Sequence, residues 1–318
     1  MHRSVVFAYH NVGVHCLRVL LEQGVDVALV VTHEDNPHEN IWFDSVAQLA
    51  EEAGIPVIKP ADPNTPEVLA HLQKLELDFL FSFYYRHMLS EAVLAVPSRG
   101  AFNMHGSLLP KYRGRVPINW AVLHGETQTG ATLHEMTVKP DAGRIVDQEP
   151  VPIAPDDTAR DVFEKVTHAA EVSLRRALPK LLHGTAHLHP QDLSQGSYFS
   201  GRNPEDGRID WGQSAQQIHN LVRAVAPPYP GAFCDIKFGD INIGGSKGHL
   251  RVLRTQLGGA APDIAAPALY TAGDDLLVAC SDGTILKILA AELNGKPLAA
   301  AQWRAINGAF PFFLGTSD

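Results

Sequence analysis

The chain has 318 residues, enough for one large or two moderate domains with ample hydrophobic cores. Hydrophobic residues make up 45% and charged residues 19% of it, which is ordinary for a soluble globular protein, and no apolar run approaches the roughly 20 residues of a membrane helix. The net charge of −9 disfavours a nucleic-acid partner unless a local basic patch exists, because the whole molecule repels polyanions.

Short apolar runs in the first third of the chain predict buried strands, and helical patterns separate them. The predicted strands cover residues 4–9, 25–32, 55–58, 79–83 and 101–104. Two helix starts lie between them: Ser45 with Gln48 forms a capping box, and Thr65 precedes Pro66 at the first helical position. Strands that alternate with helices predict an α/β fold with a mostly parallel, doubly wound, Rossmann-like sheet.

Such a sheet also suits a nicotinamide-dependent oxidoreductase. Those enzymes carry a G-x-G-x-x-G turn after the first strand and an acidic residue at the end of the second. The turn here, Tyr9–Val14, reads YHNVGV and has a single glycine. Glu34 and Asp35 follow the second strand, but a pyrophosphate has little room without the glycines. The sequence therefore disfavours this class.

The stretch Ala101–Arg115, AFNMHGSLLPKYRGR, contains the first candidate catalytic residues. Asn103 and His105 share one face of the predicted strand, since alternate side chains point the same way. An amide donor beside a titratable imidazole suits acyl transfer, because one group can hold a developing oxyanion while the other moves a proton. A further strand is predicted over residues 129–136, and the loop after it carries Asp141, which taken alone is typical of a turn.

The string NMHGSLLPKYRG from Asn103, followed by Asp141-Ala142-Gly143, resembles the formyltransferases that use 10-formyltetrahydrofolate. That family includes methionyl-tRNA, glycinamide ribonucleotide and sugar N-formyltransferases. The resemblance implies that Asn103, His105 and Asp141 are catalytic, that 10-formyltetrahydrofolate is the co-substrate and that no metal is required. Asn103 would stabilise the oxyanion and His105 would donate a proton. Asp141 would favour the charged imidazole or take the proton of the amine.

By the same resemblance, two loops form the walls of a pterin pocket, largely through backbone groups. The predicted cofactor-side residues are His87, Met88 and Leu89 on one loop and Thr137, Val138, Lys139 and Pro140 on the other. Met88 and Leu89 also suit plain packing. Arg115 is a candidate for binding a folate or substrate anion, with a solvated arginine at a helix start as the alternative.

Residues 157–182 have the pattern of a long amphipathic helix, which Pro179 could kink or end early. His183, His187 and His189 follow it, but no carboxylate or cysteine completes a ligand set, so we interpret them as loop histidines. The composition then turns to Gly, Pro, Ser, Asp and Gln. This change predicts a catalytic domain at 1–190, a linker at 191–206 and a second domain at 207–318.

The second domain begins with Arg208-Ile209-Asp210-Trp211 and a helix capped by Ser214 and Gln217. Short β-like runs with Gly-rich turns follow and predict a small OB-like antiparallel barrel. The runs cover residues 233–238, 249–255, 276–279 and 284–289. This region has few basic residues, which again disfavours nucleic acid.

Within the family, the chain most resembles the formyltransferase of UDP-4-amino-4-deoxy-L-arabinose, which acts in lipid A modification and polymyxin resistance. This closer resemblance is carried by FAYH at 7–10, SFYYRH at 82–87 and RAVAPPYPGAF at 223–233. In the best-known members that domain is fused to a decarboxylating dehydrogenase, so we expect any such activity on another chain. Tyr9, Arg202 and Tyr229 are candidates for contacting the sugar nucleotide.

Other acceptors remain open, above all a dTDP-linked amino sugar. The methionyl-tRNA enzyme carries a basic insertion after the second strand, whereas the corresponding stretch here, His33–Asn40, is acidic and unsuited to phosphates. The glycinamide ribonucleotide enzyme lacks such a second domain. A folate-binding scaffold without activity is disfavoured because all three catalytic residues are present.

The N-terminus, MHRSVVFAYH, enters an apolar strand directly and lacks a signal-peptide layout. Cys16, Cys234 and Cys280 lie far apart without a CxxC pattern, as expected of reduced thiols. We therefore expect a cytoplasmic protein that binds small molecules, without nucleic acid or membrane insertion. The oligomeric state is open, a homo-oligomer with the barrel as interface included.

Overall fold

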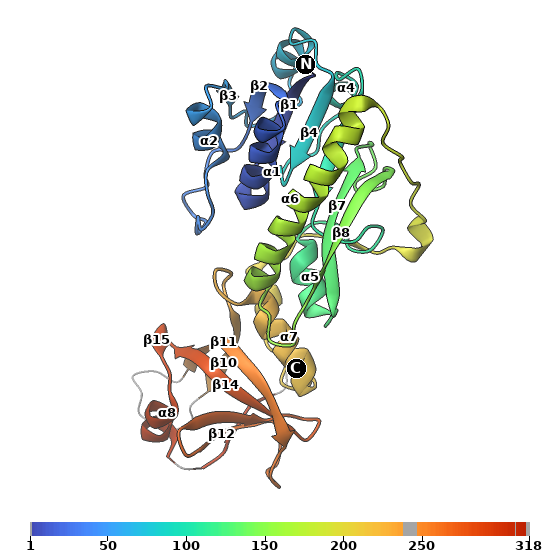
Figure 1. Ribbon diagram of the computed structural model, residues 1–318. Coiled ribbons are helices and arrows are strands. Elements are labelled where there is room, and N and C mark those ends of the chain that lie inside the picture. The colour runs from blue at the N-terminus through green and yellow to red at the C-terminus, as the bar shows by residue number, and fades with distance from the viewer. Residues whose placement is uncertain (1, 238–246, 309, 316–318) are drawn as a thin grey trace. The chain divides into compact units, whose positions relative to one another are not determined.

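The computed structural model describes residues 2–237, 247–308 and 310–315, which fall into two compact units (Figure 1). The first unit extends to Ile118 and includes residues 128–152 and 163–201. The second contains 119–127, 153–162 and the chain from Arg202 onward. The change of unit after Gly201 falls within the predicted linker, but two short segments expected in the catalytic domain belong to the second unit. The predicted domain limits themselves stay a prediction.

A seven-stranded sheet forms the centre of the first unit within the described residues, in the order β3-β2-β1-β4-β5-β7-β8. Strands β3, β2, β1, β4 and β5 pair in parallel. Strands β7 and β8 run antiparallel to their neighbours. The strands are β1 Arg3–Ala8, β2 Asp26–Val31, β3 Val57–Ile58, β4 Phe79–Phe83, β5 Gly100–His105, β7 Gln128–Glu135 and β8 Ile145–Pro152. The predicted Rossmann-like, mostly parallel sheet is confirmed.

The helices associated with this sheet begin largely where local signals predict. They are α1 His10–Glu22, α2 Val46–Glu52, α3 Pro66–Gln73, α4 Glu91–Leu94, α5 Pro117–Leu123 and α6 Ala159–His183. The Ser45 hydroxyl accepts the Gln48 amide at the start of α2, and the Thr65 hydroxyl accepts the Val68 amide at the start of α3. Pro179 lies inside α6 without ending it, since the helix continues to His183.

The two faces of the sheet carry different side chains, and this decides where the candidate site lies. Phe79, Phe81 and Phe83 stack along one face of β4, with Phe102 of β5 beside the first two. Leu80 belongs to the core on the opposite face, together with Ala101 of β5. Because side chains alternate along a strand, Asn103 and His105 follow Ala101 on that opposite face.

The second unit is built on an antiparallel sheet in the order β10-β11-β14-β13-β12-β16, with β15 paired to β14. The strands are β10 Ala232–Lys237, β11 Lys247–Ala260, β12 Ala268–Ala272, β13 Asp275–Ala279, β14 Thr284–Leu293, β15 Lys296–Pro297 and β16 Phe312–Phe313. This sheet agrees with the predicted OB-like class, although β12, β15 and β16 were not predicted. The predicted strand at 233–238 is β10, and Phe238 lies outside the described residues.

Helix α7, Ala215–Val225, packs its apolar side against this sheet and begins at the predicted Ser214–Gln217 capping box. Helix α8, Ala300–Asn307, was not predicted and inserts the fully buried Trp303 into the same core. No helix among the described residues is long and apolar enough to cross a membrane.

A short parallel pair completes the first unit and matters for the site. Strand β6, Arg113–Gly114, pairs with β9, Tyr198–Phe199. Two short 3-10 helices lie nearby in sequence, at Leu193–Gln195 and Pro204–Gly207. The β9 pairing shows that part of the predicted linker is built into the first unit.

Replacing Phe81 by Ala should lower the free energy of unfolding by about 3–5 kcal/mol, because it removes a fully buried ring and leaves a cavity. Replacing Phe313, which is 62% exposed, should change it by only about 0.5 kcal/mol. Urea denaturation followed by circular dichroism measures both. Equal losses in the two variants would contradict the assignment of the core.

Candidate active site

Three polar side chains project from neighbouring positions of β5 and β7 onto one face of the sheet. Asn103 and His105 lie on β5, and His134 of β7 is the direct cross-strand partner of Asn103. The Asn103 amide donates to His134 Nε2 at 3.1 Å. His105 and His134 are 6% and 2% exposed, whereas Asn103 is half-buried. The amide nitrogen carries a second hydrogen that this bond does not use.

Asp141 reaches the same place from the loop between β7 and β8. Its Oδ1 lies 3.5 Å from His105 Nδ1 and 3.5 Å from His134 Nε2. Its Oδ2 accepts the Gly114 amide of β6 at 2.8 Å. The structure thus brings together all three residues that the sequence nominated as catalytic and adds His134.

Backbone carbonyls hold the far side of each imidazole. His105 Nε2 donates to the Tyr112 carbonyl at 2.8 Å, and His134 Nδ1 donates to the Glu135 carbonyl at 2.8 Å. A carbonyl oxygen can only accept, so the nitrogens facing these carbonyls carry protons. The other nitrogen of each ring, Nδ1 of His105 and Nε2 of His134, faces Asp141, and in a neutral ring this nitrogen has a lone pair, so that His134 Nε2 can accept the Asn103 amide.

The electrostatic balance at Asp141 keeps its carboxylate ionised. Burial alone would raise the pKa of Asp141, but the charges of His105 and His134, a hydrogen bond from His134 and the Gly114 amide together hold it well below its usual range. A carboxylate with so low a pKa is a weak proton acceptor. In this arrangement it can stabilise a proton on the nitrogen of His105 that faces it, since His134 Nε2 accepts the Asn103 amide.

The loop predicted to contact a pterin after β4 has its backbone donors available. Within the described part of the chain, the amides of His87, Met88 and Leu89 have no hydrogen-bond partner. Asn64 fixes the loop by donating to the Met88 carbonyl at 3.0 Å and accepting the Ser90 amide at 2.7 Å. His87 and Met88 are exposed, whereas the Leu89 side chain is buried in the core and can offer a ligand only its backbone.

The second predicted loop is also accessible. Thr137, Val138 and Lys139 are exposed and Pro140 is half-buried. The Thr137 hydroxyl donates to the Lys139 carbonyl at 2.9 Å, which closes a local turn. The Arg115 side chain is exposed, and its backbone amide donates to the Phe199 carbonyl at 3.0 Å.

The residues proposed to contact a sugar nucleotide do not gather in this way. Tyr9 is buried, and its hydroxyl donates to Asp35 at 2.7 Å. Arg202 and Tyr229 belong to the second unit. The Arg202 guanidinium lies 4.8 Å from the Trp120 ring centroid and donates to the Asp206 carbonyl. Burial raises the pKa of Tyr229, against a hydrogen bond with Asn119. Their contacts with substrate stay predictions.

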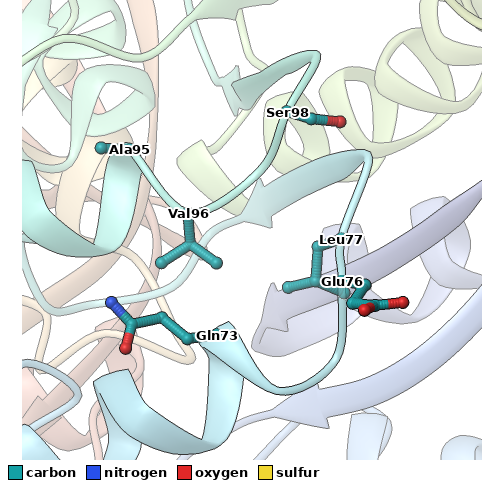
Figure 2. Close-up of a pocket in the computed structure, with 6 residues that line it drawn as sticks. All are labelled: Gln73, Glu76, Leu77, Ala95, Val96 and Ser98. Atoms are coloured by element: carbon teal, nitrogen blue, oxygen red, sulfur yellow. The ribbon is translucent and has the colours of Figure 1, made fainter.

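Two other places in the described residues are weaker candidates. A hollow of about 390 Å³ lies between the end of α3 and the turn after α4, but Figure 2 shows the Glu76 carboxylate and the Ser98 hydroxyl pointing away from Gln73 and Ala95. Its polar groups therefore do not converge on a ligand. No group of His, Cys, Asp and Glu in the described residues could hold a metal ion, and His183 donates to the Pro179 carbonyl.

Replacing His134 by Asn should raise the pKa of Asp141 toward the usual value of about 3.9, because a charge and a hydrogen bond that lower it are lost. The depressed pKa means that ionised Asp141 stabilises the fold above about pH 4, a contribution lost as the pH falls through the folded value. A ¹³C NMR titration of labelled Asp side chains measures the shift. His187→Asn, in an exposed loop, is the control and should leave the titration unchanged. An unaltered Asp141 titration in His134→Asn would refute this account of its charge.

Comparison with known structures agrees with this architecture. An N-formyltransferase from Helicobacter canadensis, in complex with folinic acid and dTDP-3-aminofucose, is 22% identical, with 91% of this chain and 99% of that chain covered and a TM-score of 0.69. WlaRD, a sugar 3N-formyl transferase solved with dTDP and 5-N-formyl-THF, is 20% identical, with 93% and 99% covered and a TM-score of 0.69. A 4-N formyltransferase from Francisella tularensis is 19% identical, with 77% and 95% covered and a TM-score of 0.61. At these identities the likeness establishes the fold.

Family models identify the chain more directly. The model of the formyl transferase family matches residues 3–178, which is more than half of the chain and includes Asn103, His105, His134 and Asp141. The model of the formyl transferase C-terminal domain matches residues 202–308. The protein therefore belongs to the formyl transferase family.

Proposed function

We propose that the protein transfers the formyl group of 10-formyltetrahydrofolate to the primary amine of a nucleotide-linked amino sugar, and that this acceptor is UDP-4-amino-4-deoxy-L-arabinose. The observation that carries the reaction type is the cluster of Asn103, His105, His134 and Asp141 in a chain of this family. Such a cluster offers a hydrogen-bond donor, a proton donor and a charge that supports it, which are the groups acyl transfer needs.

Each side chain has a distinct role in this proposal. Attack by the amine on the formyl carbon places negative charge on the carbonyl oxygen, and the free N–H of Asn103 donates to that oxygen. His134 holds the Asn103 amide in place through its Nε2. His105, anchored on the Tyr112 carbonyl, gives its Nδ1 proton to N10 of the folate as the bond from N10 to the formyl carbon breaks, and the proton that the amine loses restores the charged ring. Asp141 stabilises that charge.

The two loops beside the site fit the folate as co-substrate. A pterin is a flat ring with hydrogen-bonding groups along its edge, so it needs apolar contact on its faces and backbone donors at its rim. The unpartnered amides of His87, Met88 and Leu89 supply such donors. The exposed side chains of Met88 and Val138 supply apolar surface on the two loops. We assign the folate pocket to these residues.

The acidic stretch His33–Asn40 supports a small acceptor over a transfer RNA. Arg86 lies beside this stretch, but Glu39 binds its guanidinium through both carboxylate oxygens at 2.8 and 2.9 Å. Asp35 is held by Tyr9. A polyanion would meet a carboxylate-rich surface without a free cation from Arg86, so its phosphates would not be neutralised.

A dTDP-linked amino sugar is the second candidate acceptor. Two of the structurally similar enzymes were solved with dTDP or dTDP-3-aminofucose. Both candidates use the same chemistry and differ in the base, the sugar and the position of the amine. The segments at 7–10, 82–87 and 223–233 favour the UDP-linked arabinose amine.

A direct assay separates these acceptors. The purified protein is incubated with 10-formyltetrahydrofolate, and folate release is followed spectroscopically with each amine offered alone. We expect turnover with UDP-4-amino-4-deoxy-L-arabinose. Asn103→Ala should lower kcat by about 10²–10³-fold through loss of the oxyanion donor, and His105→Ala should abolish detectable turnover. His187→Ala, in an exposed loop, should match the wild-type protein.

The other outcomes are equally informative. Turnover with a dTDP-linked amine alone would keep the mechanism and replace the acceptor. Turnover with methionyl-tRNA alone would overturn the interpretation of the acidic stretch. Absence of turnover with every amine would contradict the proposed function.

A further inference from the structure

The segment after α6, His189–Phe199, is attached to the active-site loops rather than running free between the two units. Its His189 exchanges two backbone hydrogen bonds with Ile145 at the start of β8, at 2.7 and 2.8 Å. Ser197 accepts the Arg113 amide through its carbonyl at 3.0 Å and the Tyr112 amide through its hydroxyl at 2.8 Å. The segment therefore fixes Arg113 of β6 and the preceding Tyr112, whose carbonyl holds His105.

Gln191 of this segment holds the loop that carries Asp141. Its side-chain nitrogen donates to the Asp141 carbonyl at 3.0 Å and to the Gly143 carbonyl at 2.6 Å. One carboxamide group thus bridges both sides of Ala142 with its two hydrogens. Within the described residues, no other side chain from outside the loop bonds to the backbone of residues 137–143.

The loop needs such an anchor because its conformation is restrained at few points. Asp141 has a positive φ of 51°, a conformation that residues other than glycine adopt at a cost. Residues 137–139 are exposed. Beyond Asp141, Gly143 is packed so closely on the Glu135 carbonyl that an added Cβ would lie 1.9 Å from it. Gln191 restrains the backbone between these two residues, because it donates to the carbonyl of each.

We propose that Gln191 is a positioning residue that holds the Asp141 carboxylate against His105 and His134. The inference rests on the proposed function, because it assigns to Gln191 an effect that passes through a catalytic Asp141. Within the described residues, Gln191 makes no hydrogen bond to the imidazoles or to the carboxylate. It acts on the carbonyls on either side of the turn from which the carboxylate projects.

The test replaces Gln191 by Met, which keeps the length of the side chain and removes the donor. We expect kcat to fall by about 10²-fold, since a displacement of about 1 Å in a catalytic group has an effect of this size. The KM of each substrate should stay within about threefold of wild type, because the lost interaction serves the transition state rather than binding. Gln195→Met is the matched control, since Gln195 is exposed and close by in the chain, and should match wild type.

A second variant distinguishes the loss of the hydrogen-bond donor from a general loss of packing around residue 191. Gln191→Glu keeps the shape but turns a carboxylate oxygen toward two carbonyl oxygens. It should therefore lose more activity than Gln191→Met at neutral pH. The double variant Asp141→Asn, Gln191→Met should be no slower than Asp141→Asn alone, because residues that act through one another are not additive.

These results separate a failure of the inference from a failure of the proposed function. Full activity in Asp141→Asn would overturn the catalytic role of Asp141 and the proposed mechanism with it. Loss in Asp141→Asn combined with wild-type kcat in Gln191→Met would overturn only the role of Gln191, as would a rise confined to KM. If Gln191→Met destabilises the fold, the titration of Asp141 in that variant, recorded below its unfolding temperature, decides. A pKa raised toward the usual value supports the inference, and an unchanged one refutes it.

Discussion

The candidate active site depends on one largely buried carboxylate shared by two imidazoles. Asp141 meets His105 and His134 through a single oxygen and the Gly114 amide through the other. Burial would by itself favour the neutral acid, and the two rings reverse that preference. The other contacts of the site serve this arrangement, since each ring is fixed by a carbonyl on its far side and the loop of Asp141 is fixed by Gln191. The negative charge of Asp141 therefore lies beside the imidazoles, where an acyl transfer would use it.

The antiparallel strands at one edge of the sheet bring this carboxylate to β5. Here β7 and β8 form an antiparallel pair beside β5, which sets His134 opposite Asn103. The connection from β7 to β8 then folds back over the same face and delivers Asp141. On this face the apolar core around Leu80 and Ala101 gives way to polar residues only at the end of β5, where Asn103 and His105 lie.

Local signals in the sequence predicted much of this structure. The caps at Ser45, Thr65 and Ser214 and the first five strands follow from residue types and periodicity, and the motif around Asn103 and His105 led to Asp141. His134 was missed because its role depends on the register of β7 against β5, which one sequence does not reveal. Gln191 was missed for a similar reason. Its segment has the polar composition of a linker, yet its hydrogen bonds tie it to residues about fifty positions earlier. Such long-range pairing leaves no local pattern.

In the proposed function the reaction takes place on the face of β5 and β7 that carries Asn103 and His105 and is covered by the loop of Asp141. Addition of 5-formyltetrahydrofolate, a stable relative of the proposed donor, to ¹⁵N-labelled protein tests it most directly, by amide chemical-shift mapping. The account predicts saturable shifts of the His87, Met88, Leu89 and Val138 amides together with Gly114. Shifts confined to the hollow around Gln73, Glu76 and Ser98, with none near Gly114, would contradict it.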